Sequence, residues 1–157
     1  MPEEDLKYVD IKDVRVADLL ATFPQEEPAQ ISKDASLKEA MDAMINSKTR
    51  KVYVVDEGKL IGTITLETLL RHAGYQLGVR QPGITSFFKM LKEIGEEKAT
   101  QAMTKPTKVL KEEMIVNVTK LMVENHLNDL PVVDSENRLI GELNGSDILR
   151  YVIRASD

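Results

Sequence analysis

The sequence predicts a mixed α/β (α+β) fold built from two tandem β-α-β-β-α units that pack about a pseudo-twofold axis. The main observation is an internal repeat, because VYVVDEGKLIGTITLETLLRH at 52–72 matches LPVVDSENRLIGELNGSDILRY at 130–151. Val54 and Val132 correspond at a spacing of 78 residues, and the spacing rises to 79 after the turn that follows. The additional residue lies between two predicted strands, where hairpin loops tolerate insertion.

Each copy begins with a short strand, predicted at 29–32 and 108–110, and continues into an amphipathic helix. Ser36 and Glu39 have the spacing of a capping box, which starts the first helix, and this helix is expected to end near Ser47. Both helices carry the same apolar stripe. Its members are Leu37, Ala40, Met44 and Ile45 in the first copy and Ile115, Val118, Met122 and Val123 in the second.

The next two strands of the first copy, predicted at 52–55 and 60–64, are apolar at successive positions. This pattern is typical of strands that are buried on both faces. A unit of about sixty residues does not easily cover such a sheet by itself. We therefore expect the two copies to pack sheet to sheet and to leave a cleft between them, and a final helix follows each hairpin.

The segment between the copies is an insert that contains Phe87 and Phe88, two of the three phenylalanines of the chain. We expect a loop followed by a short helix capped by Thr85 or Ser86. This helix either packs on its own core or offers a surface to a partner or a dimer mate. The predicted organisation is an N-terminal segment 1–13, a first repeat 14–72, the insert 73–98, a second repeat 99–153 and a tail 154–157.

Composition excludes several classes of function. The chain has 21 basic and 26 acidic residues, a net charge of −5 and no basic run, so nucleic acid is not an expected partner. No apolar run approaches the ~20 residues of a membrane span, and we expect a cytoplasmic protein without a membrane partner. The absence of cysteine and the isolated positions of His72 and His126 predict neither a zinc site nor a thiolate nucleophile. No P-loop, nucleophile elbow or dinucleotide fingerprint occurs, so an enzyme is not expected.

The repeated motifs resemble those of a CBS-domain pair, also called a Bateman module, over about 14–71 and 99–153. The resemblance rests on LPVVD at 130–134, LIG at 139–141 and NGSDIL at 144–149, and on their counterparts at 52–56, 60–62 and 65–70. It implies a regulatory module, without catalysis, that binds adenosine-bearing ligands in the cleft between repeats and pairs into a dimer of four repeats.

The family places a hydroxyl residue and, three positions later, an aspartate at the start of the last helix of each repeat, for phosphate and ribose respectively. The second repeat keeps the acid, with Asn144 and Asp147, and the first keeps the hydroxyl, with Thr65 and Thr68. A carboxylate can accept hydrogen bonds from both vicinal hydroxyls of a ribose. Asp147 is equally explained as an acid that favours a helix start, and Thr65 as an N-cap.

Further candidates flank the central strands. Arg50 and Lys51 precede this strand in the first repeat, where basic residues suit phosphate, whereas Asp129 in the second repeat argues against a heavily phosphorylated ligand. One hypothesis is a composite site in which Asp147 binds ribose and Arg50 or Lys51 binds phosphate. The alternative is that Arg50 and Lys51 are only an exposed basic pair at the start of a strand. The remaining candidates are Pro131 and Gly141, because strand glycines mark close approach of backbone or ligand.

These observations favour a module that senses an adenosine compound, with AMP, ADP, ATP or an S-adenosylmethionine-like compound as candidate ligands and no required cofactor. The alternative is a structural or interaction module that binds no nucleotide. We expect a homodimer, because the helices leave apolar residues on both sides of each unit, and an unidentified regulated protein as a further partner. We also expect one nucleotide per chain, bound beside Asp147.

Overall fold

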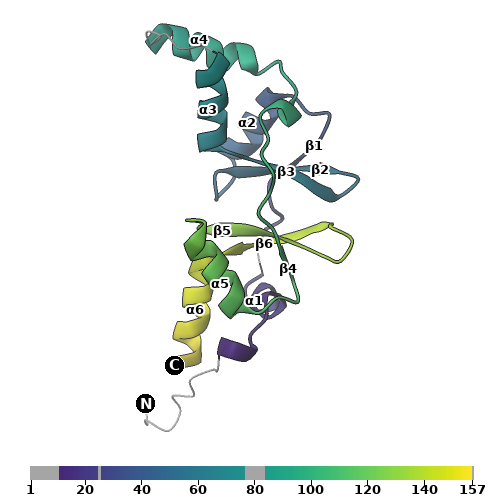
Figure 1. The fold of residues 1–157 in the computed structure, drawn as a ribbon, viewed down its shortest axis with the longest axis vertical. Helices are drawn as coiled ribbons and strands as arrows, with labels where there is room; N and C mark the ends of the chain where they lie inside the picture. Colours follow the sequence, from purple (N-terminus) through teal and green to yellow (C-terminus); the bar gives the residue numbers. More distant parts are fainter. Residues whose placement is uncertain (1–10, 25, 77–83, 157) are drawn as a thin grey trace. The chain divides into compact units, whose positions relative to one another are not determined.

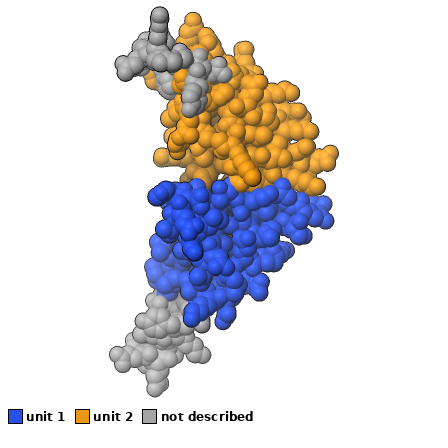
Figure 2. All heavy atoms as spheres, viewed as in Figure 1, with its two compact units in different colours: residues 1–27, 107–157 blue, residues 28–106 orange. Residues whose placement is uncertain are grey.

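The chain was analysed as a computed structural model that describes residues 11–24, 26–76 and 84–156. It divides into two compact units, unit 1 (residues 1–27 and 107–157) and unit 2 (residues 28–106), which are coloured separately in Figure 2. Unit 1 contains η2 (Ile11–Asp13), α1 (Val16–Thr22), β4 (Val109–Leu110), α5 (Ile115–Glu124), β5 (Asp129–Val133), β6 (Leu139–Asn144) and α6 (Gly145–Ser156). Unit 2 contains β1 (Gln30–Ser32), α2 (Leu37–Ile45), β2 (Lys51–Asp56), β3 (Lys59–Thr65), α3 (Leu66–Gln76), α4 (Ile84–Ile94) and η3 (Ala99–Gln101).

Each unit has the same three-stranded sheet. In unit 2 the order is β1-β2-β3, with β1 parallel and β3 antiparallel to β2, and unit 1 repeats this arrangement with β4-β5-β6. The register shifts after Val54 in one sheet and after Val132 in the other, which are equivalent positions of the repeat. In Figure 1, α2 and α3 lie on one face of the first sheet, and α5 and α6 on one face of the second. The predicted β-α-β-β-α order is confirmed in both copies.

The local signals for helix and strand also hold. Ser36 Oγ accepts a hydrogen bond from the backbone N–H of Glu39 at 3.2 Å, so it caps α2 as predicted. Three successive residues of β2, at 52–54, and three successive residues of β3, at 62–64, are buried. This confirms the predicted burial of these strands on both faces, because neighbouring strand residues point to opposite sides of the sheet.

The turn between β5 and β6 is organised by one carboxylate. Asp134 Oδ1 accepts hydrogen bonds from the backbone N–H groups of Glu136 and Arg138, each at 2.9 Å. The hydrogen bond from the Arg138 backbone is the main cause that lowers the pKa of Asp134, and the Glu136 backbone and the charges of Arg138 and Lys111 act in the same direction. The ionised form of Asp134 therefore stabilises this hairpin.

Helix α1 lies at the start of the expected first repeat, 14–72, but packs in unit 1, with the strands of the second repeat. The Val16 backbone N–H donates to the Glu113 carbonyl at 2.9 Å, and the Leu20 methyl groups lie 3.5 Å from where a Cβ on Gly141 would stand. Val16 and Leu19 are buried in the core of unit 1. The core beside the sheet of the second repeat thus includes a helix that comes from residues 16–22.

The beginning of the expected second repeat, 99–153, packs in unit 2 in a similar way, because unit 2 extends to residue 106. Thr63 and Thr104 form an isolated antiparallel bridge, with N–H···O distances of 3.0 and 2.9 Å. Next to this bridge the side chain of Met103 packs over Gly62, so close that a Cβ at this glycine would lie 2.4 Å from the sulfur. Gly62 is thus a strand glycine that another part of the chain approaches closely, and the approaching residue is a methionine of the same unit.

The predicted insert helix is α4, and it belongs to unit 2. Ile94 is 1% exposed in the core of this unit, with Met90 and Leu91 packed against it, so the helix packs on its own core. The expected cap by Thr85 or Ser86 is wrong, because the helix begins at Ile84 and both residues lie within it. The side chain of Phe87 and residues 77–83, where a loop was predicted, lie outside the described part of the chain. None of the described helices is long and apolar enough to cross a bilayer.

Candidate functional site

The second repeat turns directly from strand β6 into helix α6. Asn144, the last residue of β6, accepts hydrogen bonds at Oδ1 from the backbone N–H and the hydroxyl of Ser146, both at 3.0 Å. The Gly145 N–H donates to the Asn128 carbonyl at 2.8 Å, and a Cβ at this glycine would lie 3.1 Å from the same oxygen. The start of α6 is therefore fixed by an amide side chain and a close backbone contact.

Asp147 lies in the first turn of α6 and is only 4% exposed. The guanidinium of Arg150, one turn further along the helix and largely exposed, lies 3.4 Å from Asp147 Oδ1. A carboxylate is favoured at this place, because the N-terminal end of a helix carries a partial positive charge. The second repeat thus holds a shielded negative group whose lone pairs can accept hydrogen bonds from ligand hydroxyls.

Two more buried acids lie on the strands that lead to this helix. Asp129 pairs in register with Asn144, and Glu142 pairs with Pro131. Both acids are buried, although burial of a charged group is costly without compensating contacts. Glu142 was not among the residues predicted from the sequence. Its burial was predictable, because it is equivalent to Thr63, 79 residues earlier, in a strand whose apolar pattern predicted burial on both faces.

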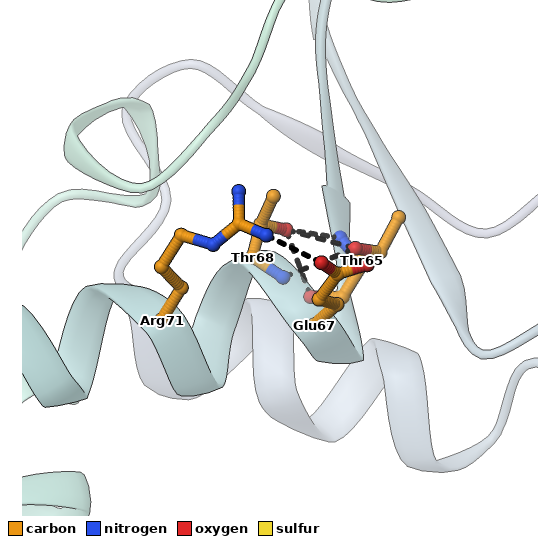
Figure 3. Close-up of polar contacts among 4 residues, drawn as sticks. All are labelled: Thr65, Glu67, Thr68 and Arg71. Atoms are coloured by element: carbon orange, nitrogen blue, oxygen red, sulfur yellow. Dashed lines mark hydrogen bonds and ion pairs between the residues drawn. The ribbon is translucent and has the colours of Figure 1, made fainter. Parts of the chain in front are cut away.

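The equivalent helix start in unit 2 has a different chemistry, shown in Figure 3. Thr65 Oγ1 accepts from the Thr68 N–H at 3.1 Å, Thr68 Oγ1 accepts from the Thr65 N–H at 2.7 Å, and the two hydroxyls are 3.0 Å apart. The two threonines form a closed reciprocal cap, which confirms the N-cap interpretation of Thr65. Glu67, the acid nearest to this cap, is exposed and pairs with Arg71. No carboxylate takes the position of Asp147 here.

The other predicted residues divide between the units. Pro131 is buried in β5 and Gly141 lies in β6, so both belong to the hairpin that leads to Asp147. Arg50 is exposed, with the left-handed φ of 55°, and Lys51 opens β2 in register with Thr65. These basic residues belong to unit 2, and their joint site with Asp147 stays a prediction.

The two histidines show no metal-binding arrangement. His72 Nε2 and Glu97 Oε2 are 2.7 Å apart, which ties α3 to the segment before η3. Within the described ranges, no three side chains of histidine, aspartate or glutamate gather in a way that could hold a metal ion.

Comparison with known proteins identifies the family. The sequence model of the CBS domain matches this chain twice, at residues 16–75 and 98–154. The chain belongs to the CBS-domain family. The two matches correspond to the two β-α-β-β-α copies, so the chain contains a pair of CBS repeats.

Relatives of this CBS-domain chain occur in Methanocaldococcus jannaschii. An uncharacterized protein of that organism is 28% identical over 148 residues, which cover 82% of this chain and 88% of the relative. A longer uncharacterized protein is 28% identical over 118 residues, and the chain spans 40% of its length.

Solved CBS-domain structures have the same fold. A CBS-domain protein of Thermotoga maritima has a TM-score of 0.68 at 25% identity, with 90% of this chain and 95% of that chain covered. A CBS-domain protein of Pyrobaculum aerophilum, complexed with AMP, has a TM-score of 0.64 at 16% identity, with 90% and 99% covered. The protein CBSX2, also in complex with AMP, has a TM-score of 0.67 at 20% identity, with 91% and 98% covered.

Proposed function

We propose that this CBS-domain chain is a regulatory module that senses an adenosine-containing ligand without converting it. The observation that carries the proposal is the shielded carboxylate of Asp147 in the first turn of α6. Two proteins of the same fold have been crystallised with AMP, which supports an adenine nucleotide as the ligand class. AMP, ADP, ATP and S-adenosylmethionine-like compounds share the ribose that this carboxylate suits.

The proposed contacts follow from the chemistry of each side chain. Asp147 accepts hydrogen bonds from the ribose hydroxyls, and Asn144 positions the helix start through its bonds to Ser146. A hydrogen bond to a charged group contributes about 1.5–3 kcal/mol. Arg50 and Lys51 are the proposed phosphate contacts, because guanidinium and ammonium groups bind phosphate oxygens strongly.

The difference between the repeats leads to one nucleotide per chain. In unit 2 the hydroxyls of Thr65 and Thr68 bond to each other and to the backbone, and they offer no carboxylate to a ribose. The missing charged hydrogen bond corresponds to roughly 10- to 150-fold in affinity. Binding beside Asp147 should therefore exceed binding beside Thr68 by this factor.

A second candidate function is that of an interaction module without a nucleotide. The closed Thr65–Thr68 cap favours it, because a helix start that satisfies its own donors needs no ligand. In this case the chain binds a protein partner, which it regulates or with which it assembles, and no nucleotide.

Titration calorimetry with AMP and adenosine separates the two candidates. We expect Asp147→Ala to weaken AMP binding roughly 10- to 150-fold. Thr68→Ala, at the equivalent position of the other repeat, is the matched control and should leave AMP affinity unchanged. Arg50→Ala should weaken AMP more than adenosine, because the bare nucleoside has no phosphate for the guanidinium to bind.

Three results would contradict the proposal. These are two equal AMP sites per chain, wild-type AMP affinity in a folded Asp147→Ala variant, and loss of affinity in Thr68→Ala as large as in Asp147→Ala. Absence of binding by every adenosine compound at millimolar concentration, in a protein with an intact melting transition, would establish the second candidate instead.

A further inference from the structure

The junction between β6 and α6 contains the pair Asn144–Gly145, the only place in the sequence where glycine follows asparagine. The other five asparagines precede larger residues. The side-chain amide of an asparagine can be attacked by the backbone nitrogen of the next residue, and asparagine is accordingly one of the thermolabile residue types. Glycine leaves this nitrogen accessible because it has no Cβ. The junction is therefore the position of the chain that is chemically most open to loss of a side-chain amide.

The folded structure restrains both groups that would react. The two hydrogen bonds from Ser146 to Asn144 Oδ1, each 3.0 Å long, fix the orientation of the amide. The Gly145 N–H donates to the Asn128 carbonyl at 2.8 Å, which fixes the peptide group that contains the attacking nitrogen. An intramolecular attack needs its two atoms close together and aligned. The native hydrogen bonds hold these groups in the geometry of a helix start instead.

The junction also packs on the core of unit 1. A Cβ at Gly145 would lie 3.3 Å from Cε of Met122, which is a buried member of that core. Opening of the junction therefore depends on how firmly the core of unit 1 holds it. The equivalent junction of unit 2, Thr65–Leu66, has no side-chain amide, so this chemistry is confined to unit 1.

We propose that Asn144 is a site of spontaneous covalent modification, which the folded junction holds back and which reacts when unit 1 opens. The Gly145 nitrogen forms a bond to Cγ of Asn144, the bond from Cγ to Nδ2 breaks, and ammonia leaves with the proton of the Gly145 N–H. Water then opens the resulting cyclic imide. Attack of water on Cγ gives aspartate, and attack on the main-chain carbonyl carbon gives isoaspartate.

The two products change the junction in different ways. Aspartate adds a negative charge at the start of α6, keeps the length of the backbone and can still accept the hydrogen bonds from Ser146. Isoaspartate routes the main chain through Cγ, which inserts an additional carbon atom between β6 and α6. The bond from Gly145 to Asn128 and the buried position of Asp147 cannot both survive this insertion. Past opening of unit 1 is thus recorded as a permanent change, and this inference does not depend on nucleotide binding.

Peptide mapping by mass spectrometry tests the site and its protection. The full chain is incubated at mildly alkaline pH, either in native buffer or in guanidinium chloride. We expect the Asn144 peptide to gain the mass difference between water and ammonia at least about tenfold more slowly in native buffer. Asn144→Gln should not gain it in either solvent, because the longer side chain disfavours the ring. Equal rates for the wild-type chain in the two solvents would overturn the proposal.

A matched pair of core variants tests the route through unit 1. Ile115 and Leu37 occupy equivalent positions of the repeat, 78 residues apart, and are buried in the cores of unit 1 and unit 2 respectively. In native buffer, Ile115→Ala should accelerate the reaction at Asn144 by at least about tenfold, and Leu37→Ala should have a much smaller effect. If an alanine variant does not fold, Ile115→Val and Leu37→Val are the milder pair, with the same expected order. An unchanged rate in the unit 1 variant, or equal acceleration by both variants, would overturn the route.

The products themselves give an independent test. The isoaspartate form is quantified by enzymatic methylation and separated by chromatography, and Asn144→Asp serves as the control for the added charge alone. We expect the isoaspartate form to melt several degrees below the wild-type chain, and Asn144→Asp to melt close to it. An isoaspartate form with the wild-type melting temperature would contradict the proposed change of the junction.

Discussion

A single methyl group at Gly62 should destabilise unit 2, whereas the same change at the equivalent Gly141 should not. A Cβ at Gly62 would lie 2.4 Å from the Sδ atom of Met103, 2.8 Å from Cγ and 2.9 Å from Cβ. Rotation of the thioether does not relieve the last of these contacts, because the Met103 Cβ is attached to the backbone. That backbone is held beside β3 by the hydrogen-bonded bridge at Thr104.

The magnitude follows from the cost of overpacking. An extra methyl group that forces side-chain and backbone shifts costs about 1–3 kcal/mol. At Gly141 the nearest atoms to an added Cβ are the Leu20 methyl groups at 3.5 Å, an ordinary van der Waals contact. Replacement of a strand glycine by alanine without a clash stabilises by roughly 0.5–1 kcal/mol. The two variants should therefore differ in unfolding free energy by at least about 1.5 kcal/mol.

Thermal unfolding with hydrogen exchange measures both the size and the place of the effect. Gly62→Ala should lower the melting temperature by about 2–12 °C, and faster exchange should be confined to amides of β2 and β3. Gly141→Ala should keep or raise the melting temperature. In Gly62→Ala/Met103→Ala the space is restored, so this double variant should be no less stable than Met103→Ala alone. Equal stability of Gly62→Ala and Gly141→Ala, or no relief in the double variant, would refute the reasoning.

Two further predictions concern α4 and the hairpin of unit 1. Ile94→Ala should destabilise unit 2 by about 2–5 kcal/mol in denaturant titrations, because this side chain is buried in the core. Phe88→Ser should have a much smaller effect, because Phe88 is 63% exposed. Equal effects of the two substitutions would contradict the packing of α4. The lowered pKa of Asp134 means that its ionised form stabilises the fold above the ordinary pKa range of aspartate, and that this contribution is lost as the pH falls through the folded-state pKa. Asp134→Ala should therefore be less stable than wild type at neutral pH and approach it in acid, and a pH-independent difference for Asp134→Ala would exclude this role.

Much of the fold was predictable from local patterns. The repeated apolar stripe predicted the helices, and the pairs of apolar strands predicted the hairpins. Each of these signals arises among residues that are close together in the sequence. The cap of α2 by Ser36 was predictable for the same reason. The start of α4 was not, because serine and threonine in a first turn resemble a cap in sequence.

The candidate site was predictable in its residue types more than in its surroundings. The spacing of Asn144 and Asp147 identified the helix start, and the missing acid at Thr68 identified the difference between repeats. The Arg150 contact with Asp147 also follows from helical spacing, because the two residues lie three positions apart on α6. The packing of Met103 on Gly62 was beyond reach, because it joins residues 41 positions apart in the sequence through tertiary structure.

The packing of α1 with the second repeat has a consequence for the order in which the protein assembles during synthesis. Unit 2 is a continuous stretch, residues 28–106, so all its parts have left the ribosome while the second repeat is still being translated. Helix α1 is made before unit 2, yet its binding surface on β6 is made after unit 2. The apolar face of α1 must therefore stay exposed to chaperones until β6 has emerged from the ribosome. A helix that is synthesised before unit 2 thus reaches its final position only after unit 2 is able to fold.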